Sequence, residues 1–293
     1  MRRHLMFAVP LMAAVLATGC GDTGADSAVD SPESVQAAAV ERAAEANFEG
    51  TLQQVVTSVG AEAIRSIAGT SDPQAIVDFP AERVLEAVES GEVEPGMLQE
   101  TTMEIKGPMA RMQAVGDPTY TILDGREGVA RVVDTENQMI MTMNPAAMAE
   151  AASAHGEQAE APQFEVTEVG EASIRGYDAT GYRFDFVGDN VATVWLSEEL
   201  GESVGPIFDL WFAINPFGQI ELGAGAPIRI VVVNKGVLES GGNRFVSLPA
   251  YTITDFYNLE QGDISDERFA LPEGYQERSL ADLAAGAGAN SND

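Results

Sequence analysis

The fold of this chain is decided by residues 97–143, which read MLQETTMEIKGPMARMQAVGDPTYTILDGREGVARVVDTENQMIMTM. Apolar and polar residues alternate here in short runs, a pattern that is typical of half-buried strands. The runs are separated by Gly107-Pro108, by Gly116-Asp117-Pro118 and by Asp124-Gly125. The last of these dipeptides favours a tight hairpin. The stretch therefore predicts an antiparallel β-meander.

The flanking sequence predicts more strands and several helices. Strands are expected over residues 164–169, 172–174, 182–187, 191–196, 228–233 and 245–257. Helix-forming residues predict helices over 34–46, 61–68, 81–90, 145–161 and 206–214. The last of these is apolar nearly all round, so it is expected to be buried. Together the segments predict an α+β fold with one long, mostly antiparallel sheet and helices on one side.

The N-terminus has the layout of a secretory signal. Arg2 and Arg3 precede an apolar run over residues 5–16, and small residues lead to Cys20. The apolar run is shorter than the roughly 20 residues of a membrane-spanning helix. We therefore expect residues 1–19 to be a cleaved signal peptide and residues 20–33, which are rich in Gly, Asp, Ser and Ala, to be a flexible tether. Residues 34–283 form the expected domain, and residues 284–293 an expected disordered tail.

Cys20 is the only cysteine of the chain, so it cannot form an internal disulfide. Residues 16–20 resemble the lipobox of bacterial lipoproteins, although Ala17 stands where Leu is more usual. This resemblance implies that Cys20 carries lipid and anchors the protein to a membrane by several acyl chains. Secretion with a free thiol is the alternative. Gly21 favours the outer membrane, facing the periplasm, over retention on the outer face of the inner membrane.

The charge of the chain excludes one class of partner. The sequence has 46 acidic against 16 basic residues, a net charge of −30. Such a surface repels nucleic acid, so DNA or RNA binding is not expected. At 45% hydrophobic residues, the chain has ample material for a core.

Motifs for catalysis are weak in this sequence. Residues 201–205 match the G-x-S-x-G pattern of a nucleophile elbow around Ser203, which needs a strand before it, a helix after it and a later histidine. After signal cleavage the remaining histidine is His155, which lies upstream, so a Gly-flanked turn before the 206–214 helix is preferred. His155 also lacks the thiol and imidazole partners of a zinc site. We expect no enzyme activity, cofactor or metal, and a serine hydrolase using Ser203 is the alternative.

Methionines gather in the meander. Met139, Met141 and Met143 alternate along one strand, so their thioethers share a face. Further methionines lie on neighbouring strands, at Met103, Met109 and Met112. Three interpretations remain open: filling of an irregular core, a plastic pocket for acyl chains, and a Cu(I) site.

Three short segments carry a resemblance to a known family. They are Met103 to Gly125 with the meander after it, Ile174-Arg175-Gly176-Tyr177 with the strand that ends at Ser197, and the closing stretch Phe269 to Tyr275. Together they resemble uncharacterised bacterial lipoprotein domains of the LolA/LolB/LppX-like, lipoprotein carrier-like superfamily. The resemblance implies an unclosed half-barrel, a strongly curved antiparallel sheet with helices packed in its concave face.

The resemblance also implies an apolar cavity between sheet and helices that holds lipid or acyl chains, with no catalytic residues. Side chains expected to line it are Met103, Met112, Met139, Met141, Met143, Phe208 and Trp211. Phe48, Trp195, Trp211 and Tyr251 are expected in the core. Departures from the family occur over residues 61–90, 145–161 and 201–243, which would fill the cavity if they packed inside it. The alternative function is a structural or interaction lipoprotein with a filled core.

Overall fold

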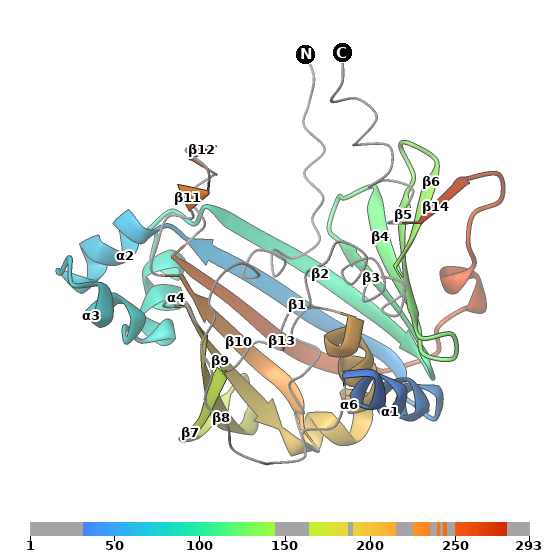
Figure 1. Ribbon diagram of the computed structural model, residues 1–293, viewed down its shortest axis with the longest axis horizontal. Helices are drawn as coiled ribbons and strands as arrows, with labels where there is room; N and C mark the ends of the chain where they lie inside the picture. Colours follow the sequence, from blue (N-terminus) through green and yellow to red (C-terminus); the bar gives the residue numbers. More distant parts are fainter. Residues whose placement is uncertain are drawn as a thin grey trace.

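The computed structural model describes residues 32–143, 164–186, 190–214, 225–234, 239–240, 243–244 and 250–279. The expected signal peptide, most of the tether, the 145–161 helix and the tail lie outside these residues. The described residues form a large, unclosed, mixed sheet with a few helices (Figure 1). The α+β expectation is confirmed at this level.

The main sheet has 12 strands in the order β14-β6-β5-β4-β3-β2-β1-β13-β10-β9-β8-β7. Their bounds are β1 Glu49–Val59, β2 Met97–Lys106, β3 Met109–Ala114, β4 Thr119–Asp124, β5 Val129–Asp134, β6 Met139–Met143, β7 Phe164–Ile174, β8 Tyr177–Phe186, β9 Asn190–Ser197, β10 Ala226–Val233, β13 Tyr251–Gln261 and β14 Gln276–Ser279. A separate two-stranded ribbon joins β11 (Glu239–Ser240) to β12 (Asn243–Arg244). The helices are α1 Pro32–Ala44, α2 Ala61–Ala68, α3 Pro73–Val77, α4 Ala81–Glu89, α6 Glu198–Ile214 and the 3₁₀ helix η1 Asp266–Phe269.

Two meanders, β2–β6 and β7–β10, flank a central pair made of β1 and β13. The first confirms the expectation for residues 97–143, including the turn at Asp124-Gly125. Among the described strands of this sheet, neighbours pair antiparallel except β14 with β6, which are parallel. The pairing of β1 with both β13 and β2 joins the two meanders into one sheet.

Several expected boundaries are corrected. The sequence predicts no strand before Met97, so β1 was not expected. Its Gln53-Gln54 pair interrupts the apolar alternation that would indicate a strand. The predictions also missed α3, and they divided β7 into two strands at a bulge that the pairing shows between Glu168 and Gly170. Helix α1 begins at Pro32, inside the expected tether. The first part of the strand expected over residues 245–257, up to residue 249, lies outside the described residues.

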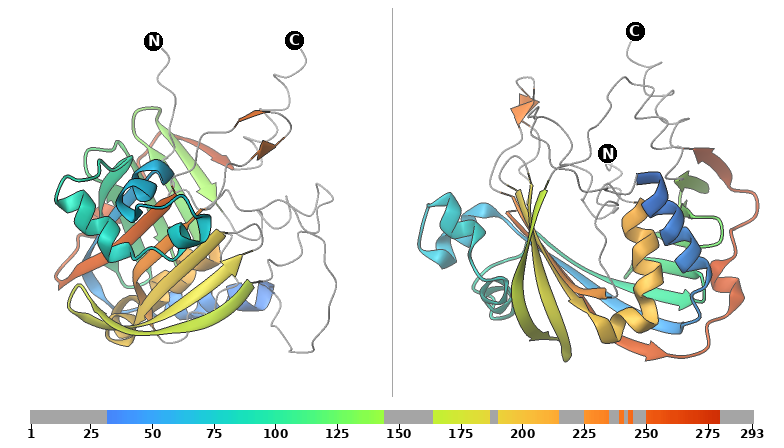
Figure 2. Two further views of the ribbon diagram at one scale, coloured as in Figure 1. Left: turned by 90° about the vertical axis from the view of Figure 1, so that its left-hand side faces the viewer. Right: turned by 60° about the horizontal axis from the view of Figure 1, so that its bottom comes forward.

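The sheet is strongly bent, and the helices occupy both of its faces. Figure 2 shows α1 and α6 within the bend, whereas α2, α3 and α4 lie outside it at the opposite end of the molecule. The expectation that all helices lie on one side is therefore wrong. The reason is amphipathicity, because α2 and α4 each present a buried apolar side chain, Ile64 and Val84, to strand ends that are themselves apolar on their outer face.

Two separate apolar clusters follow from this arrangement. The inner cluster joins α1 and α6 to β1–β5, β7–β10 and β13, with Leu52, Ile105 and Phe256 among its buried members. The outer cluster joins α2, α3 and α4 to the ends of β1, β9, β10 and β13 and includes Tyr251. Tyr251 is buried as expected, whereas Phe48, Trp195 and Trp211 are partly buried against the inner cluster.

Helix α1 approaches the β4–β5 turn very closely. A Cβ atom placed on Gly125 would lie 2.9 Å from the Cβ of Ala43 and 2.9 Å from the carbonyl oxygen of Pro108. Only a residue without a side chain fits between the helix and the hairpin. The turn dipeptide Asp124-Gly125 therefore also determines how α1 docks on the sheet.

The residues just before the closing stretch of the family resemblance hold the C-terminal segment against β2 and β3. Arg268, on η1, donates from Nε to both carboxylate oxygens of Glu104, at 2.9 and 3.0 Å. Lys106 Nζ lies 2.7 Å from the carboxylate of Asp266. These contacts lead the chain past the meander to β14, which then pairs with β6.

Candidate functional site

The inner face of strands β1–β6 carries a row of side chains that are apolar except at Thr121. The strand register places one residue from each of six neighbouring strands opposite the next, in the order Leu52, Met103, Met112, Thr121, Val132 and Met141. Residues that are directly opposite in a sheet share a face and have Cβ atoms about 5 Å apart. Three of the predicted lining residues, Met103, Met112 and Met141, therefore lie in one row.

A second row runs beside the first and alternates small with large side chains. It contains Gly50, Ile105, Ala110, Leu123, Ala130 and Met143. Ala110, Leu123 and Ala130 are buried in the same cluster as Ala43 of α1. The small residues leave room for α1, so this row is where helix and sheet approach each other.

The methionines differ in exposure along these rows. Met103 and Met141 are buried, at 1% and 5% of their accessible surface. Met112, Met139 and Met143 are only partly buried. The alternation along β6 puts Met139, Met141 and Met143 on one face, as the sequence predicts. Met109 lies three residues from Met112 on β3 and so faces the other side.

Helix α6 brings the two predicted aromatic residues to the other end of the inner face. Phe208 is 1% exposed and packs edge-on against Phe256, with ring centroids 4.9 Å apart. Trp211 stacks beside Phe208 at 6.4 Å and is partly buried. Helix α6 packs mainly against α1 and β10, with further contacts to β8 and β9. Five of the seven predicted residues are thus methionines on β2, β3 and β6 and two are aromatic residues on α6, and Met103 and Phe208 are buried in the same inner cluster.

The G-x-S-x-G stretch lies inside a helix. Residues 201–205 belong to α6, which begins at Glu198 and continues past Pro206 to Ile214. The expected Gly-flanked turn is therefore wrong, because the sequence reading started this helix at Pro206. A nucleophile elbow needs a sharp strand-to-helix turn that exposes the serine. Ser203 instead occupies the second turn of a helix, where its side chain is partly buried.

Metal-binding groups do not gather in the described part of the chain. Within it, no three side chains of His, Cys, Asp or Glu are placed to hold an ion. Cys20 and both histidines, His4 and His155, lie outside the described ranges.

The outer face carries a buried ion cluster that the sequence reading missed. Arg229 on β10 donates to both carboxylate oxygens of Asp255 on β13, from Nε at 2.5 Å and from Nη2 at 2.9 Å. Asp255 is fully buried and also accepts from Arg175 Nε at 3.0 Å, while Arg229 Nη1 reaches Glu82 at 3.0 Å. Burial lowers the pKa of Arg229, but its hydrogen bonds and attraction to Asp255 and Glu82 outweigh this and raise the pKa overall.

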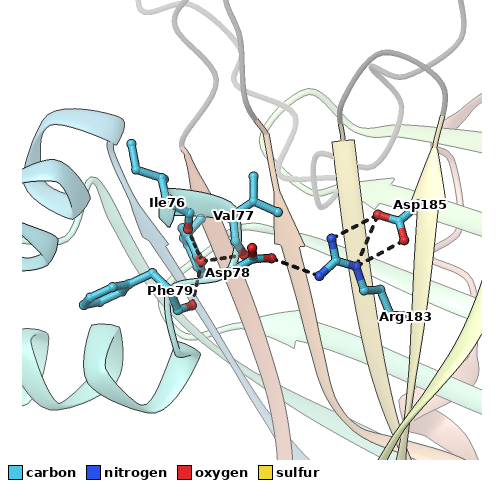
Figure 3. A network of polar contacts seen from close by, with 7 residues as sticks. Ile76, Val77, Asp78, Phe79, Arg183 and Asp185 are labelled. Atoms are coloured by element: carbon cyan, nitrogen blue, oxygen red, sulfur yellow. Dashed lines mark hydrogen bonds and ion pairs between the residues drawn. The ribbon is translucent and has the colours of Figure 1, made fainter. Parts of the chain in front are cut away.

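A second polar network ties α3 to the outer face. Figure 3 shows the guanidinium of Arg183, on β8, between Asp185 and Asp78. The phenol of Tyr251 donates toward the carbonyl oxygens of Ile76 and Phe79, which lie 2.6 and 2.7 Å from its oxygen. The last carbonyls of a helix lack partners within it, so the phenol helps to satisfy the C-terminal end of α3. Such long-range polar contacts have no signature in the local sequence.

No family model matches the chain, and no curated protein matches its sequence.

Similar solved structures exist at low identity. An uncharacterized conserved protein from Thermus thermophilus is 9% identical, with a TM-score of 0.34, over 85% of this chain and 99% of that one. A putative outer membrane lipoprotein-sorting protein domain from Vibrio parahaemolyticus is 8% identical, with a TM-score of 0.28, over 81% and 97%. The MucA/MucB complex of Pseudomonas aeruginosa contains a chain that is 9% identical, with a TM-score of 0.33, over 84% and 64%.

Among the described helices, none has both the length and the apolar character that crossing a membrane requires.

Proposed function

We propose that this protein is a non-catalytic, lipid-anchored lipoprotein of the cell envelope that binds an acyl chain or another apolar ligand on the inner face of the meander. The observation that carries the proposal is the pair of apolar rows across β1–β6, in which Met112 and Met143 keep part of their surface exposed. A ligand lying along these rows would cover that surface. The hydrophobic effect favours such a contact in proportion to the apolar area that is removed from water.

The chemistry of the rows suits a ligand of variable shape. Methionine is unbranched and adapts to irregular neighbours, and its thioether makes no strong hydrogen bond. Thr121, in the middle of the first row, is the one hydroxyl among apolar partners. The proposed ligand is therefore a flexible hydrocarbon rather than a polar metabolite. The methionine group Met103, Met112, Met139, Met141 and Met143 would form its binding surface.

A filled interior is the second candidate, and a specific observation favours it at the other end of the sheet. Leu200, Val204, Ile207, Phe208 and Leu210 of α6 are all buried, each at 1% exposure or less. The aromatic end of the inner face is thus packed by the chain itself. If the same holds for the methionine end in the whole protein, the protein is a structural or interaction lipoprotein without a ligand.

The anchor is the other part of the proposal. Cys20 lies 12 residues before the first residue of α1. A tether of that length reaches about 40 Å when extended. Lipid on Cys20 would hold the domain close to the membrane, which we propose to be the outer membrane, on its periplasmic side. The domain would then meet acyl chains or their carriers by diffusion along one surface.

The test is to recover the ligand from the full-length protein. The protein is purified from membranes in mild detergent, delipidated fractions are kept as blanks, and bound molecules are identified by native mass spectrometry. We expect an acyl-containing molecule in addition to the covalent lipid. Binding of the fluorescent fatty acid cis-parinaric acid to the purified protein gives a second readout. If no lipid co-purifies and the probe does not bind, the filled-core candidate replaces the proposal.

A further inference from the structure

The edge of the sheet at β7 is open in the part of the chain that the structure describes. β7 is last in the strand order and pairs there with β8 alone (Figure 1). One row of its backbone N–H and C=O groups consequently has no neighbouring strand among the described residues. Such a row is a template on which another extended segment can pair.

This edge exposes two large apolar side chains. Val166 and Val169 keep 50% and 45% of their surface exposed. Val166 is opposite Phe184, which is buried in the inner cluster. Val169 lies over Gly181, where an added Cβ would be 2.6 Å from its Cγ2 atom. The valines therefore extend the apolar surface of the sheet to its edge, and an added strand would cover them.

The charge of the edge decides which partner fits. Residues 164–174 read FEVTEVGEASI and contain three glutamates and no basic residue. Glu168 and Glu171 are exposed beside the two valines. Pairing of β7 with a second copy of itself would bring these carboxylates together, and the net charge of −30 opposes the same contact. The complementary partner is a basic segment.

We propose that β7 is a docking edge for an extended, lysine- or arginine-rich segment of another protein, which adds as the next strand and places its cations beside Glu168 and Glu171. The pairing bulge between Glu168 and Gly170 bends the edge, so a short segment fits better than a long strand. Backbone hydrogen bonds would supply affinity, and the cations would supply selectivity. This edge and the methionine strand β6 lie near opposite ends of the strand order, so the two proposals are independent.

The probe is a fluorescently labelled, amidated peptide of about eight residues that alternates Lys and Val. Its binding to the protein is measured by fluorescence anisotropy. A second version, N-methylated on every backbone amide, keeps the side chains and charge but cannot donate to an edge. We expect the first peptide to bind and the second to lose binding. The variant Glu168→Lys/Glu171→Lys should bind the Lys-Val peptide about tenfold more weakly and should gain affinity for a Glu-Val peptide.

The matched control is Glu92→Lys/Glu94→Lys, which changes the net charge equally at two exposed positions in the connection between α4 and β2. It should bind the Lys-Val peptide nearly as tightly as the unaltered protein. An equal loss in both double variants, or equal binding of the methylated peptide, would mean general attraction to an acidic surface and would overturn the proposal. Absence of binding by every peptide, or self-association of the protein through this edge, would overturn it as well.

Discussion

Arg229 and Asp255 form a buried bidentate ion pair between neighbouring strands, with 2.5 Å from Nε to Oδ1 and 2.9 Å from Nη2 to Oδ2. The two residues are direct partners in the register of β10 with β13. Since a one-residue slip of either strand would put its charged side chain on the other face of the sheet, away from its partner, the pair favours this register. Arg175, at φ 54° in the β7–β8 turn, adds a third charge to the same carboxylate and lies over the ring of Tyr257 at 5.1 Å.

Removing one partner of this pair should be strongly destabilising. We expect Arg229→Met to lower the free energy of unfolding by about 3–5 kcal/mol, because the buried carboxylate of Asp255 loses both of its hydrogen bonds from Arg229. The double variant Arg229→Met/Asp255→Leu should recover much of that loss, because it also removes the buried carboxylate, which in the single variant keeps only Arg175 as a partner. Urea unfolding followed by circular dichroism measures both. Equal stability of the single and double variants would show that the pair carries no such penalty.

Tyr251 should make stability fall steeply at high pH. Burial, followed by the charge of Asp78, raises the pKa of its phenol well above the ordinary value. Above about pH 10 the phenol ionises in the unfolded chain but not in the folded one, so the unfolded state binds fewer protons and the free energy of unfolding decreases. Tyr251→Phe removes this contribution, and its stability should depend less on pH between about pH 10 and 11.5.

At neutral pH the same variant should be less stable by about 1–3 kcal/mol, because the carbonyls at the end of α3 lose a buried hydrogen-bond donor. Hydrogen exchange should show the loss first in α3 and α4. The assigned role of the phenol would be contradicted by two results together. These are unchanged hydrogen exchange in α3 and α4 and a free energy of unfolding that depends on alkaline pH as in the unaltered protein.

The apolar rows predict which substitutions weaken ligand binding. Met112→Gln and Met143→Gln keep the length of the side chain but put an amide on the inner face, where a ligand would desolvate it. We expect about tenfold weaker binding of cis-parinaric acid by either variant. Thr142→Gln is the control, because Thr142 lies next to Met143 on β6 and faces the other side. If all three variants bind the probe equally, the ligand does not lie on these rows.

Lipidation is predicted at a single residue, Cys20, on its thiol sulfur and on the amino group that signal cleavage exposes. Mass analysis of the mature protein should find an N-terminal peptide that begins at Cys20 and carries acyl chains. Cys20→Ala should lack this peptide and should be lost from the detergent phase when cells are extracted, because the chains supply the membrane affinity. An unmodified Cys20 in a soluble product would contradict the anchor.

We expect Ser203 to have no catalytic role. It lies in the second turn of α6, whereas a nucleophile elbow needs the serine on a sharp strand-to-helix turn. Purified protein should therefore not hydrolyse nitrophenyl butyrate above the rate in buffer, and Ser203→Ala should not change this. Ester hydrolysis that disappears in Ser203→Ala would revive the hydrolase alternative.

The sequence by itself determined the local elements of this protein. The alternation and turns of residues 97–143 predicted β2–β6, and the M-x-M-x-M spacing placed three thioethers on one face of β6. These features depend on the two-residue period of a strand and on turn chemistry, which are properties of neighbouring residues. For the same reason the predictions are wrong where local signals are mixed. The Gln53-Gln54 pair hid strand β1, and Gly201 and Gly205 hid the first part of helix α6.

Only the tertiary structure decided how those elements meet. Nothing near Glu49 indicates that β1 lies between β2 and β13, and nothing near Gln276 indicates a parallel pair with β6. Three further features depend on segments that are far apart in the chain: the face of the sheet on which each helix packs, the burial of Met103 and Phe208 in one cluster, and the pairing of Arg229 with Asp255. Burial and charge pairing act between segments that meet only when the sheet assembles. No short stretch of sequence therefore determines which segments contact each other.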